Sequence, residues 1–271
     1  MGLNRILKRI SGEKNKILQL AEKILDLLFP PRCAFCDEIL SPGQKGICAD
    51  CLEKLPLIRE PFCMKCGKML AGGEKEYCGD CEKNRHLFYA SRAVLGYDER
   101  VRRSIYRFKY SGRKEYAKAY AALAGEQLAD WIGSVNPDAI VPVPLHRSRY
   151  RRRGYNQSQL LAKELAKLTG CPLEDGLVIR AKKTRPQKRL DLAGREENLK
   201  KAFKIRRNDV KLNRVLLVDD IYTTGSTMDA VTECLTQVGV KRVYGLTIAV
   251  GQPRGGTKNA GEELQEVRKT V

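Results

Sequence analysis

The sequence lacks any long apolar run. Its first 29 residues mix Leu and Ile with Lys, Arg and Glu, unlike the apolar stretch of a secretory signal. No segment approaches the roughly 20 apolar residues that a membrane-spanning helix needs. We therefore expect a cytoplasmic protein without a transmembrane segment. In that reducing compartment, its 10 cysteines are expected to bind metal and not to form disulfides.

Acidic residues are scarce relative to basic ones. The chain has 32 Asp and Glu against 51 Lys and Arg, which gives a net charge of +19. This excess favours an anionic partner, such as a phosphorylated metabolite, a nucleic acid or an anionic membrane surface. A solvated basic surface is the alternative. Hydrophobic residues still make up 42% of the chain, which allows a packed core and excludes a disordered protein.

Four regions follow one another along the chain. Residues 1–31 have Leu and Ile at helical spacing and end in two prolines, which predicts an amphipathic helical segment. Its basic side could lie at the inner face of the cell membrane, or its apolar face could pack against its own domain. Residues 32–86 are rich in Cys, Gly and Pro, residues 87–250 alternate between strand-like and helix-like runs, and the polar residues 251–271 are expected to be disordered.

The third region predicts an α/β fold. Strands are expected at residues 93–97, 139–143, 215–218 and 242–250, and helices at residues 116–131, 158–168 and 227–238. Strands that alternate with helices predict an open parallel sheet covered on both faces.

Eight cysteines form four C-x-x-C pairs that recur every fifteen residues. The pairs are Cys33/Cys36, Cys48/Cys51, Cys63/Cys66 and Cys78/Cys81. Each C-x-x-C turn presents two thiolates, so consecutive pairs predict two structural four-cysteine Zn²⁺ sites. A disulfide framework and iron–sulfur ligation are the alternatives, and the latter lacks its usual spacings. The block has almost no apolar periodicity, so we expect metal to hold it in place of a core.

Four further Cys and His residues lie outside this pattern. Cys171 and Cys234 sit alone in apolar contexts and are expected to be buried and inert. Neither His86 nor His146 is needed as a zinc ligand, and His86 is expected at the surface or at a boundary.

Residues 215–227, VLLVDDIYTTGST, combine a buried strand, two carboxylates and a hydroxyl-rich loop that opens a helix. In an open parallel sheet, ligands bind beyond the carboxyl ends of the strands. Such a loop offers backbone N–H groups and hydroxyls to a phosphate, and Gly225 allows it to curl tightly. Asp219 and Asp220 would repel a phosphate but suit the hydroxyl donors of a ribose. The segment therefore predicts a ribose 5-phosphate site.

Two other interpretations of this segment explain less. A strand end followed by a helix N-cap at Ser226 or Thr227 accounts for one hydroxyl, but not for two carboxylates and four hydroxyls around a glycine. A receiver-type acidic pair would instead hold a metal ion. No Gly-Lys-Ser/Thr follows, which excludes a Walker-type loop.

The segment resembles the phosphoribosyl-pyrophosphate motif of type I phosphoribosyltransferases, an apolar strand, two acids, a short spacer and T-G-x-T. The resemblance implies Mg²⁺-bound phosphoribosyl pyrophosphate as ligand, with Asp219 and Asp220 as catalytic residues at the ribose. It implies a pyrophosphate loop over Pro144–Arg147 and a closing loop over Ala181–Asn198. The residues implied to bind substrate are Thr223, Thr224, Gly225, Ser226, Thr227, Leu145 and His146, and Arg147 is implied as a catalytic cation.

Further segments are similar to the ComF (ComFC/GntX-like) family, over roughly residues 22–250. They are Leu28–Cys33, Val141–Pro144, Arg153–Gln157 and the Gln187, Arg195 and Asn198 segment. This resemblance implies a type I phosphoribosyltransferase domain behind an N-terminal double zinc ribbon. It also implies a role in handling incoming single-stranded DNA during natural competence, with a helicase-like ATPase and a DNA-processing protein as partners.

Two basic segments frame the choice of function. Leu145–Gly154 holds five arginines, and Arg180–Arg207 holds twelve basic residues against three acidic ones. As loops at the sheet edge, they would stabilise a pyrophosphate leaving group together with Mg²⁺ and exclude water. Alternatively, they form a surface of a non-catalytic protein that binds single-stranded DNA. Nearby aromatic residues could then stack on the bases of that DNA, or they could be buried in the core instead. Those aromatic residues are Tyr106, Phe108, Tyr110, Tyr150 and Tyr155.

Overall fold

The computed structural model describes residues 30–70, 75–181, 202–207 and 211–251, and the chain divides into two compact units. The units are residues 1–53 and 54–271, so the division lies within the predicted zinc block. The predicted domain limits stay predictions. The predicted helical segment before Pro30, the tail after Gly251 and residues 182–198 of the predicted closing loop lie outside the described residues.

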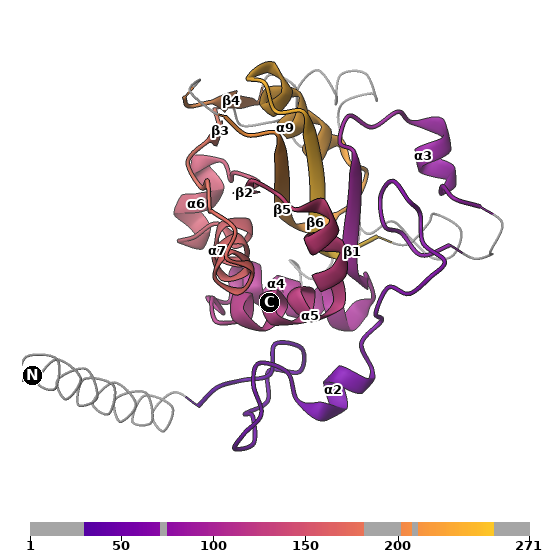
Figure 1. The fold of residues 1–271 in the computed structure, drawn as a ribbon. Coiled ribbons are helices and arrows are strands. Elements are labelled where there is room, and N and C mark those ends of the chain that lie inside the picture. The colour runs from indigo at the N-terminus through magenta and orange to yellow at the C-terminus, as the bar shows by residue number, and fades with distance from the viewer. Residues whose placement is uncertain (1–29, 71–74, 182–201, 208–210, 252–271) are drawn as a thin grey trace, which may run out of the picture. The chain divides into compact units, whose positions relative to one another are not determined.

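A four-stranded parallel sheet forms the centre of the second unit (Figure 1). Its strands, in spatial order, are β1 (Ala90–Gly96), β6 (Arg242–Val250), β5 (Arg214–Tyr222) and β2 (Ala139–Pro142). All three neighbouring pairs are parallel. The predicted α/β fold with a parallel sheet is therefore confirmed.

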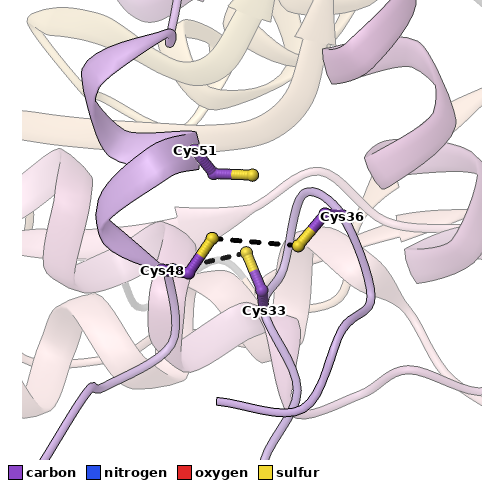
Figure 2. A group of neighbouring side chains, drawn as sticks. All are labelled: Cys33, Cys36, Cys48 and Cys51. Atoms are coloured by element: carbon purple, nitrogen blue, oxygen red, sulfur yellow. Dashed lines mark hydrogen bonds between the residues drawn. The ribbon is translucent and has the colours of Figure 1, made fainter. Parts of the chain in front are cut away.

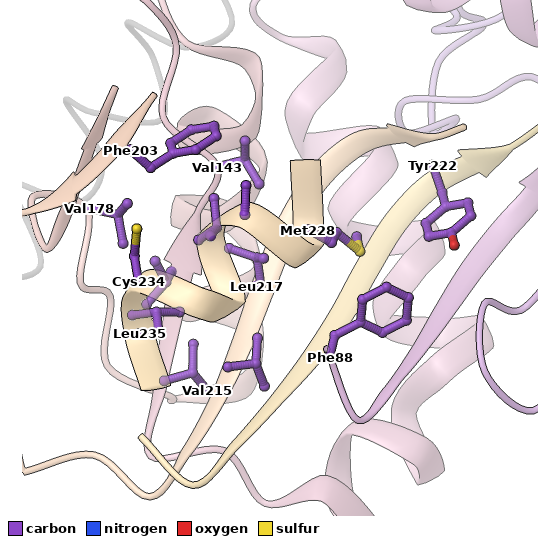
Figure 3. Packing of buried hydrophobic residues seen from close by; sticks show 14 of the residues in the cluster. Phe88, Val143, Val178, Phe203, Val215, Leu217, Tyr222, Met228, Cys234 and Leu235 are labelled. Carbon is purple, nitrogen blue, oxygen red and sulfur yellow. The ribbon is translucent and has the colours of Figure 1, made fainter. Parts of the chain in front are cut away.

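Burial on both faces explains the continuous apolar runs of the central strands. Val215 and Leu217 of β5 belong to one hydrophobic cluster with residues of helix α9 (Ser226–Gln237), as Figure 3 shows. Leu216 and Val218 point to the opposite face by strand alternation and are equally buried. The strand nevertheless continues beyond the predicted end at Val218, because its pairing with β6 runs on through Tyr222. The acidic pair that follows Val218 therefore lies within the paired strand and not after it.

The predicted helices are present; the first two are longer than expected, and the third is shifted by one residue toward the N-terminus. They are α5 (Tyr116–Val135), α7 (Gln157–Thr169) and α9. Helix α7 begins where the Asn156 side chain accepts a hydrogen bond from Ser158 N, and it ends at Gly170 in the left-handed conformation. Helices α5 and α7 pack on each other and on the sheet. Among the described residues, no helix has the length and apolarity that a membrane crossing requires.

Several elements were not expected from the sequence. Helix α4 (Glu99–Tyr110) follows β1, and β3 (Val178–Arg180) pairs with β4 (Phe203–Ile205) in an antiparallel two-stranded sheet. In each zinc-type group one helical turn, α2 (Ala49–Glu53) or α3 (Gly79–Lys83), begins within the second cysteine pair and contains its last cysteine.

The interpretation of Leu145–Gly154 as a loop is wrong. Residues 147–153 form helix α6, Arg147–Arg153. Arginine is a good helix former, and both ends of the run are capped. The His146 side chain accepts a hydrogen bond from Ser148 N, and Gly154 closes the helix with φ of 78°.

Candidate functional site

The eight paired cysteines form two groups, each made of consecutive C-x-x-C pairs as the spacing predicts. The groups are Cys33, Cys36, Cys48 and Cys51, shown in Figure 2, and Cys63, Cys66, Cys78 and Cys81. In each group the sulfur atoms lie within 4.8 Å of one another.

The sulfur separations fit a bound zinc ion. Cys36 Sγ lies 3.8 Å from Cys48 Sγ, and Cys66 Sγ lies 3.6 Å from Cys78 Sγ. A tetrahedral site with Zn–S bonds of about 2.3 Å has S···S edges of about 3.8 Å. Four thiolates complete that coordination and leave no open position for a substrate. Both groups are therefore structural zinc-ribbon sites.

The two groups are copies of one motif, offset by thirty residues. Cys33 N donates to Glu38 O at 2.8 Å, and Cys63 N donates to Lys68 O at 2.7 Å. The residue after each first C-x-x-C pair is left-handed, with φ of 68° at Asp37 and 75° at Gly67. The repeat in sequence is thus a repeat in backbone structure.

The Cys33 thiol shows how such a knuckle favours a metal-binding thiolate. Burial opposes ionisation of Cys33, but backbone N–H groups of Cys36, Cys48 and Phe35 outweigh burial and lower its pKa to about 7. Cys48 N and Phe35 N each lie 3.4 Å from Cys33 Sγ.

The second zinc ribbon is built into the core of the second unit. Cys63, Cys66 and Cys78 are buried in the main hydrophobic cluster. Ser91 N donates to Lys65 O at 2.7 Å, which joins the knuckle to strand β1. The expectation that metal alone holds the cysteine block is therefore wrong for this ribbon, because sheet packing holds it as well.

Gly67 permits this close docking. A Cβ atom at Gly67 would lie 3.0 Å from backbone atoms of Ser91, Arg92 and Ala93. Asp37 occupies the equivalent place in the first ribbon, so the tight approach is specific to the second one.

The acidic pair of β5 is held by two residues from distant parts of the chain. Asp219 Oδ1 accepts hydrogen bonds of 2.8 Å from Ser158 Oγ and from Asp220 N. Lys109 Nζ donates to Asp220 Oδ1 at 2.8 Å, and both side chains of this ion pair are largely buried. Burial, and then the neighbouring carboxylate of Asp220, raise the pKa of Asp219 to about 7.

Residues 153–158 fix the start of α7 against the ends of the strands. Asn156 Nδ2 donates to Val143 O at 3.0 Å, just beyond β2. Two residues later, Ser158 reaches Asp219. The Arg153–Gln157 segment, which resembles the ComF family, therefore begins the turn whose side chains position the acidic pair.

The hydroxyl-rich loop follows β5 directly and opens α9. Thr223 and Thr224 are exposed, and Thr224 Oγ1 lies 2.9 Å from Ser226 Oγ. The N-cap is Gly225, with φ of 80°, and not Ser226 or Thr227. The capping interpretation of these hydroxyls is therefore wrong. The loop offers hydroxyls and helix N-terminal N–H groups beside the acidic pair.

His86 lies beneath this loop, so of its two expected positions, at the surface or at a boundary, the surface position is wrong. Its side chain is 5% exposed, and Nδ1 lies 2.7 Å from Asp229 Oδ2 in the first turn of α9. Nε2 lies 3.3 Å from the hydroxyl of Tyr222, and the ring stacks on Phe88 at 4.9 Å between centroids. A buried polar ring is retained here because both nitrogens have partners.

Arginines gather near the acidic pair. Burial, and then the charge of Arg149, lower the pKa of Arg180 to about 10, while Asp219 opposes this effect. Burial, and then Arg153, lower the pKa of Arg149. Arginines that lie close enough to lower the pKa of a neighbouring arginine are stabilised by a bound anion, so this edge of the sheet suits a phosphorylated ligand.

An aromatic side chain borders the arginines. Arg153 Nη2 donates to Tyr110 Oη at 2.9 Å, and Arg152 lies 5.6 Å from the Tyr110 ring centroid. Tyr110 and Tyr150 are exposed, whereas Tyr155 is buried and donates to Phe108 O. The predicted aromatic group therefore divides between surface and core.

The remaining predicted residues have local roles. His146 caps α6, and Arg147 is exposed at the first position of that helix. Cys234 is buried as predicted. Cys171 is half-buried, and its sulfur lies 3.3 Å from Pro137 O, so the prediction of full burial is wrong there.

The fold and site define a class: an open parallel sheet of the type I phosphoribosyltransferase kind, preceded by two zinc ribbons. The family model of the phosphoribosyl transferase domain matches residues 113–266, and that of the double zinc ribbon domain matches residues 24–82. The first match covers more than half of the chain. The chain thus belongs to the phosphoribosyl transferase domain family and carries a double zinc ribbon, and the resemblance of its sequence to the ComF family is confirmed by relatives with competence names.

Curated relatives agree with this assignment. Competence protein F of Haemophilus influenzae is 42% identical over 117 residues, which are 42% of this chain and 51% of that protein. DNA utilization protein YhgH of Escherichia coli K12 is 35% identical over 142 residues, 51% of this chain and 62% of that protein. Competence protein ComFC of Bacillus subtilis is 29% identical over 157 residues, 56% and 60% of the two chains. The matches thus span 51 to 62% of these relatives' own lengths.

Among solved structures, a purine phosphoribosyltransferase from Pyrococcus horikoshii Ot3 is similar with a TM-score of 0.30 and 16% identity. That similarity covers 52% of this chain and 92% of the other.

Proposed function

We propose that the chain binds Mg²⁺-phosphoribosyl pyrophosphate at the carboxyl end of β5 and transfers its phosphoribosyl group to an acceptor. One observation carries the proposal. The carboxylates of Asp219 and Asp220 are fixed by Ser158 and Lys109, and the hydroxyl loop at the N-terminus of α9 follows them directly. The loop suits the 5-phosphate, and the carboxylates suit the ribose hydroxyls.

The donor set also fits a magnesium ion bound together with its ligand. Mg²⁺ prefers oxygen ligands and keeps several from water or phosphate, so two carboxylates near a diphosphate are sufficient. When bound, the ion would neutralise charge on the pyrophosphate. Asp219 and Asp220 would interact with this ion indirectly, through the ribose hydroxyls and through water bound to the ion. No dedicated set of protein ligands is therefore needed.

The residues support a displacement at C1 of the ribose. The bond from C1 to the pyrophosphate oxygen breaks, and its electron pair leaves with the pyrophosphate. Positive charge that develops on the sugar lies near the Asp219 and Asp220 carboxylates. Negative charge on the leaving group is stabilised by the arginines that crowd this edge, Arg149 and Arg180. The acceptor's nucleophile then forms the new bond to C1.

The test is calorimetric titration with phosphoribosyl pyrophosphate and Mg²⁺, followed by an assay of pyrophosphate release with candidate acceptors. Asp219→Asn and Asp220→Asn together should weaken binding by about tenfold or more, because the ribose hydroxyls lose charged acceptors. Asp175→Asn, a change of an exposed carboxylate, is the matched control. Equal affinity of the wild type and the double variant would contradict the ribose assignment.

A second candidate function is single-stranded DNA binding by a non-catalytic competence factor. The exposed Tyr110, flanked by Arg152 and Arg153, favours it, because an aromatic face beside cations can stack a base and contact the backbone. The names of the relatives point to DNA uptake as well. A helicase-like ATPase and a DNA-processing protein would be its partners.

Salt dependence separates the DNA surface from general charge attraction. Arg152→Gln with Arg153→Gln should weaken oligo-dT binding and reduce the slope of log K against log salt by about 0.7 per lost phosphate contact. Lys118→Gln with Lys163→Gln removes the same charge from exposed positions of α5 and α7. Identical slopes for both double variants would count against this surface. DNA binding without pyrophosphate release would favour the second function.

A further inference from the structure

His86 connects the second zinc ribbon to the proposed phosphate loop. Its Nδ1 and the backbone N–H of Leu87 contact the two carboxylate oxygens of Asp229, each at 2.7 Å. Asp229 lies in the first turn of α9, and its own N–H donates to Gly225 O at 2.9 Å. The segment at His86 and Leu87 therefore holds the helix turn on which the loop ends.

The same ring forms the surface against which the loop glycine packs. A Cβ atom at Gly225 would lie 2.7 Å from His86 Cε1 and 2.9 Å from His86 Nδ1. It would also lie 2.6 Å from the hydroxyl of Tyr222. Both rings are buried, so neither can swing aside at small cost. The backbone at Gly225 thus rests directly on His86 and Tyr222.

The zinc ribbon fixes the place of His86. The ring follows the metal-type ligand Cys81 by five residues, and helix α3 (Gly79–Lys83) contains that cysteine. On its other side, β1 is joined to the ribbon through Ser91 N and Lys65 O. His86 also lines a pocket of about 550 Å³ together with Lys65 and Cys81 of the ribbon. The linker that carries His86 is therefore held at both ends.

We propose that His86 is a positioning residue for the loop at residues 223–227, and that the second four-cysteine site sets its position. As a statement about ligand affinity, this rests on the proposed phosphoribosyl function. As a statement about the conformation of the loop, it stands on the contacts alone. The proposal assigns no role to the first four-cysteine site, which belongs to the other compact unit.

Hydrogen exchange of the full, zinc-loaded chain tests the loop directly. His86→Leu keeps an apolar group against Phe88 but removes Nδ1, so peptides spanning residues 221–229 should exchange faster while those of β6 do not. His86→Asn retains an N–H near the Nδ1 position and should restore protection. Asp229→Ala removes the same bond from α9 and should reproduce the His86→Leu result, which keeps the test open if His86→Leu does not fold.

Titration with ribose 5-phosphate gives the functional arm. We expect His86→Leu to weaken binding by about tenfold, the loss typical of a hydrogen bond to a charged group, and His86→Asn to bind nearly as the wild type does. Ile132→Ala, which leaves a cavity at a buried position of α5, is the control for general destabilisation. A wild type that does not bind ribose 5-phosphate would refute the proposed function, while the exchange arm would still decide the role of His86.

The metal arm compares two matched substitutions. Cys81→Ser in the second site should increase exchange at residues 221–229 and weaken ribose 5-phosphate binding, whereas Cys51→Ser at the equivalent place in the first site should do neither. The proposal is overturned if His86→Leu and Asp229→Ala leave exchange at the loop unchanged. It is also overturned if Cys51→Ser and Cys81→Ser act alike, or if His86→Asn fails to restore protection.

Discussion

Lys109 and Asp220, which are 111 residues apart in the sequence, form a largely buried ion pair of 2.8 Å at the carboxyl end of β5. Lys109 comes from α4, which the strand and helix pattern of the sequence did not predict. The pair places the Lys109 ammonium group against the Asp220 carboxylate, which is also expected to accept hydrogen bonds from the ribose hydroxyls. Ligand binding and the stability of this edge are thus linked through one contact.

Removal of Lys109 should destabilise the protein more than removal of both partners. Lys109→Met leaves a buried carboxylate unpaired, so we expect the free energy of unfolding to fall by about 2–4 kcal/mol. Lys109→Met combined with Asp220→Asn should recover much of that loss. Urea unfolding of the single and double variants measures the difference, and Lys118→Met on the surface of α5 is the control. An equal loss in single and double variants would show that the pair is not coupled.

Asp219 should make stability depend on pH. Its folded pKa of about 7 lies above the unfolded value near 3.8, so the folded chain holds a proton that the unfolded chain releases between these limits. Stability from this group is therefore present at low pH and is lost as the pH rises toward 7.

Asp219→Asn removes that dependence. The variant should gain stability relative to the wild type as the pH rises, by at most about 4 kcal/mol above pH 7 and by little near pH 4. Urea unfolding at pH 5 and pH 8 measures the gap, and Asp175→Asn provides the control. A gap of the same size at both pH values would exclude a raised pKa at Asp219.

Gly225→Ala should be more harmful than an alanine at another left-handed glycine. Gly112 has φ of 72°, and a Cβ atom placed there would have no atom within 4 Å, so Gly112→Ala reports backbone strain alone, about 1 kcal/mol. Gly225→Ala adds overpacking against His86 and Tyr222, typically about 1–3 kcal/mol more. Chemical denaturation compares the two variants. Equal losses of unfolding free energy in the two variants would mean that the His86 and Tyr222 rings move aside at little cost.

Metal analysis should find about two zinc ions per chain in protein purified without chelator. Cys51→Ser and Cys81→Ser should each lower this number by about one, because each change removes a ligand from a different four-cysteine group. A surface change such as Lys118→Met should leave the zinc content unaltered. Protein without zinc would contradict both sites.

Local patterns predicted much of this protein correctly. The C-x-x-C spacing predicted the grouping of the cysteines, because the ligands of each site lie within nineteen residues of one another. The strand, acidic pair, hydroxyl loop and helix of residues 215–227 are contiguous, so their proximity did not depend on the rest of the fold. The parallel sheet followed from the alternation of apolar strands with helices.

Tertiary packing decided what surrounds those segments. Ser158 reaches Asp219 across 61 residues, and His86 reaches Asp229 across 143. No periodicity encodes such contacts, because they depend on the order β1-β6-β5-β2 in which the strands assemble. The sequence by itself thus determined the zinc knuckles and the hydroxyl-rich loop that follows the acidic pair. The tertiary structure decided that the second knuckle joins the core and that His86 lies beneath the loop, since both result from packing between segments far apart in the chain.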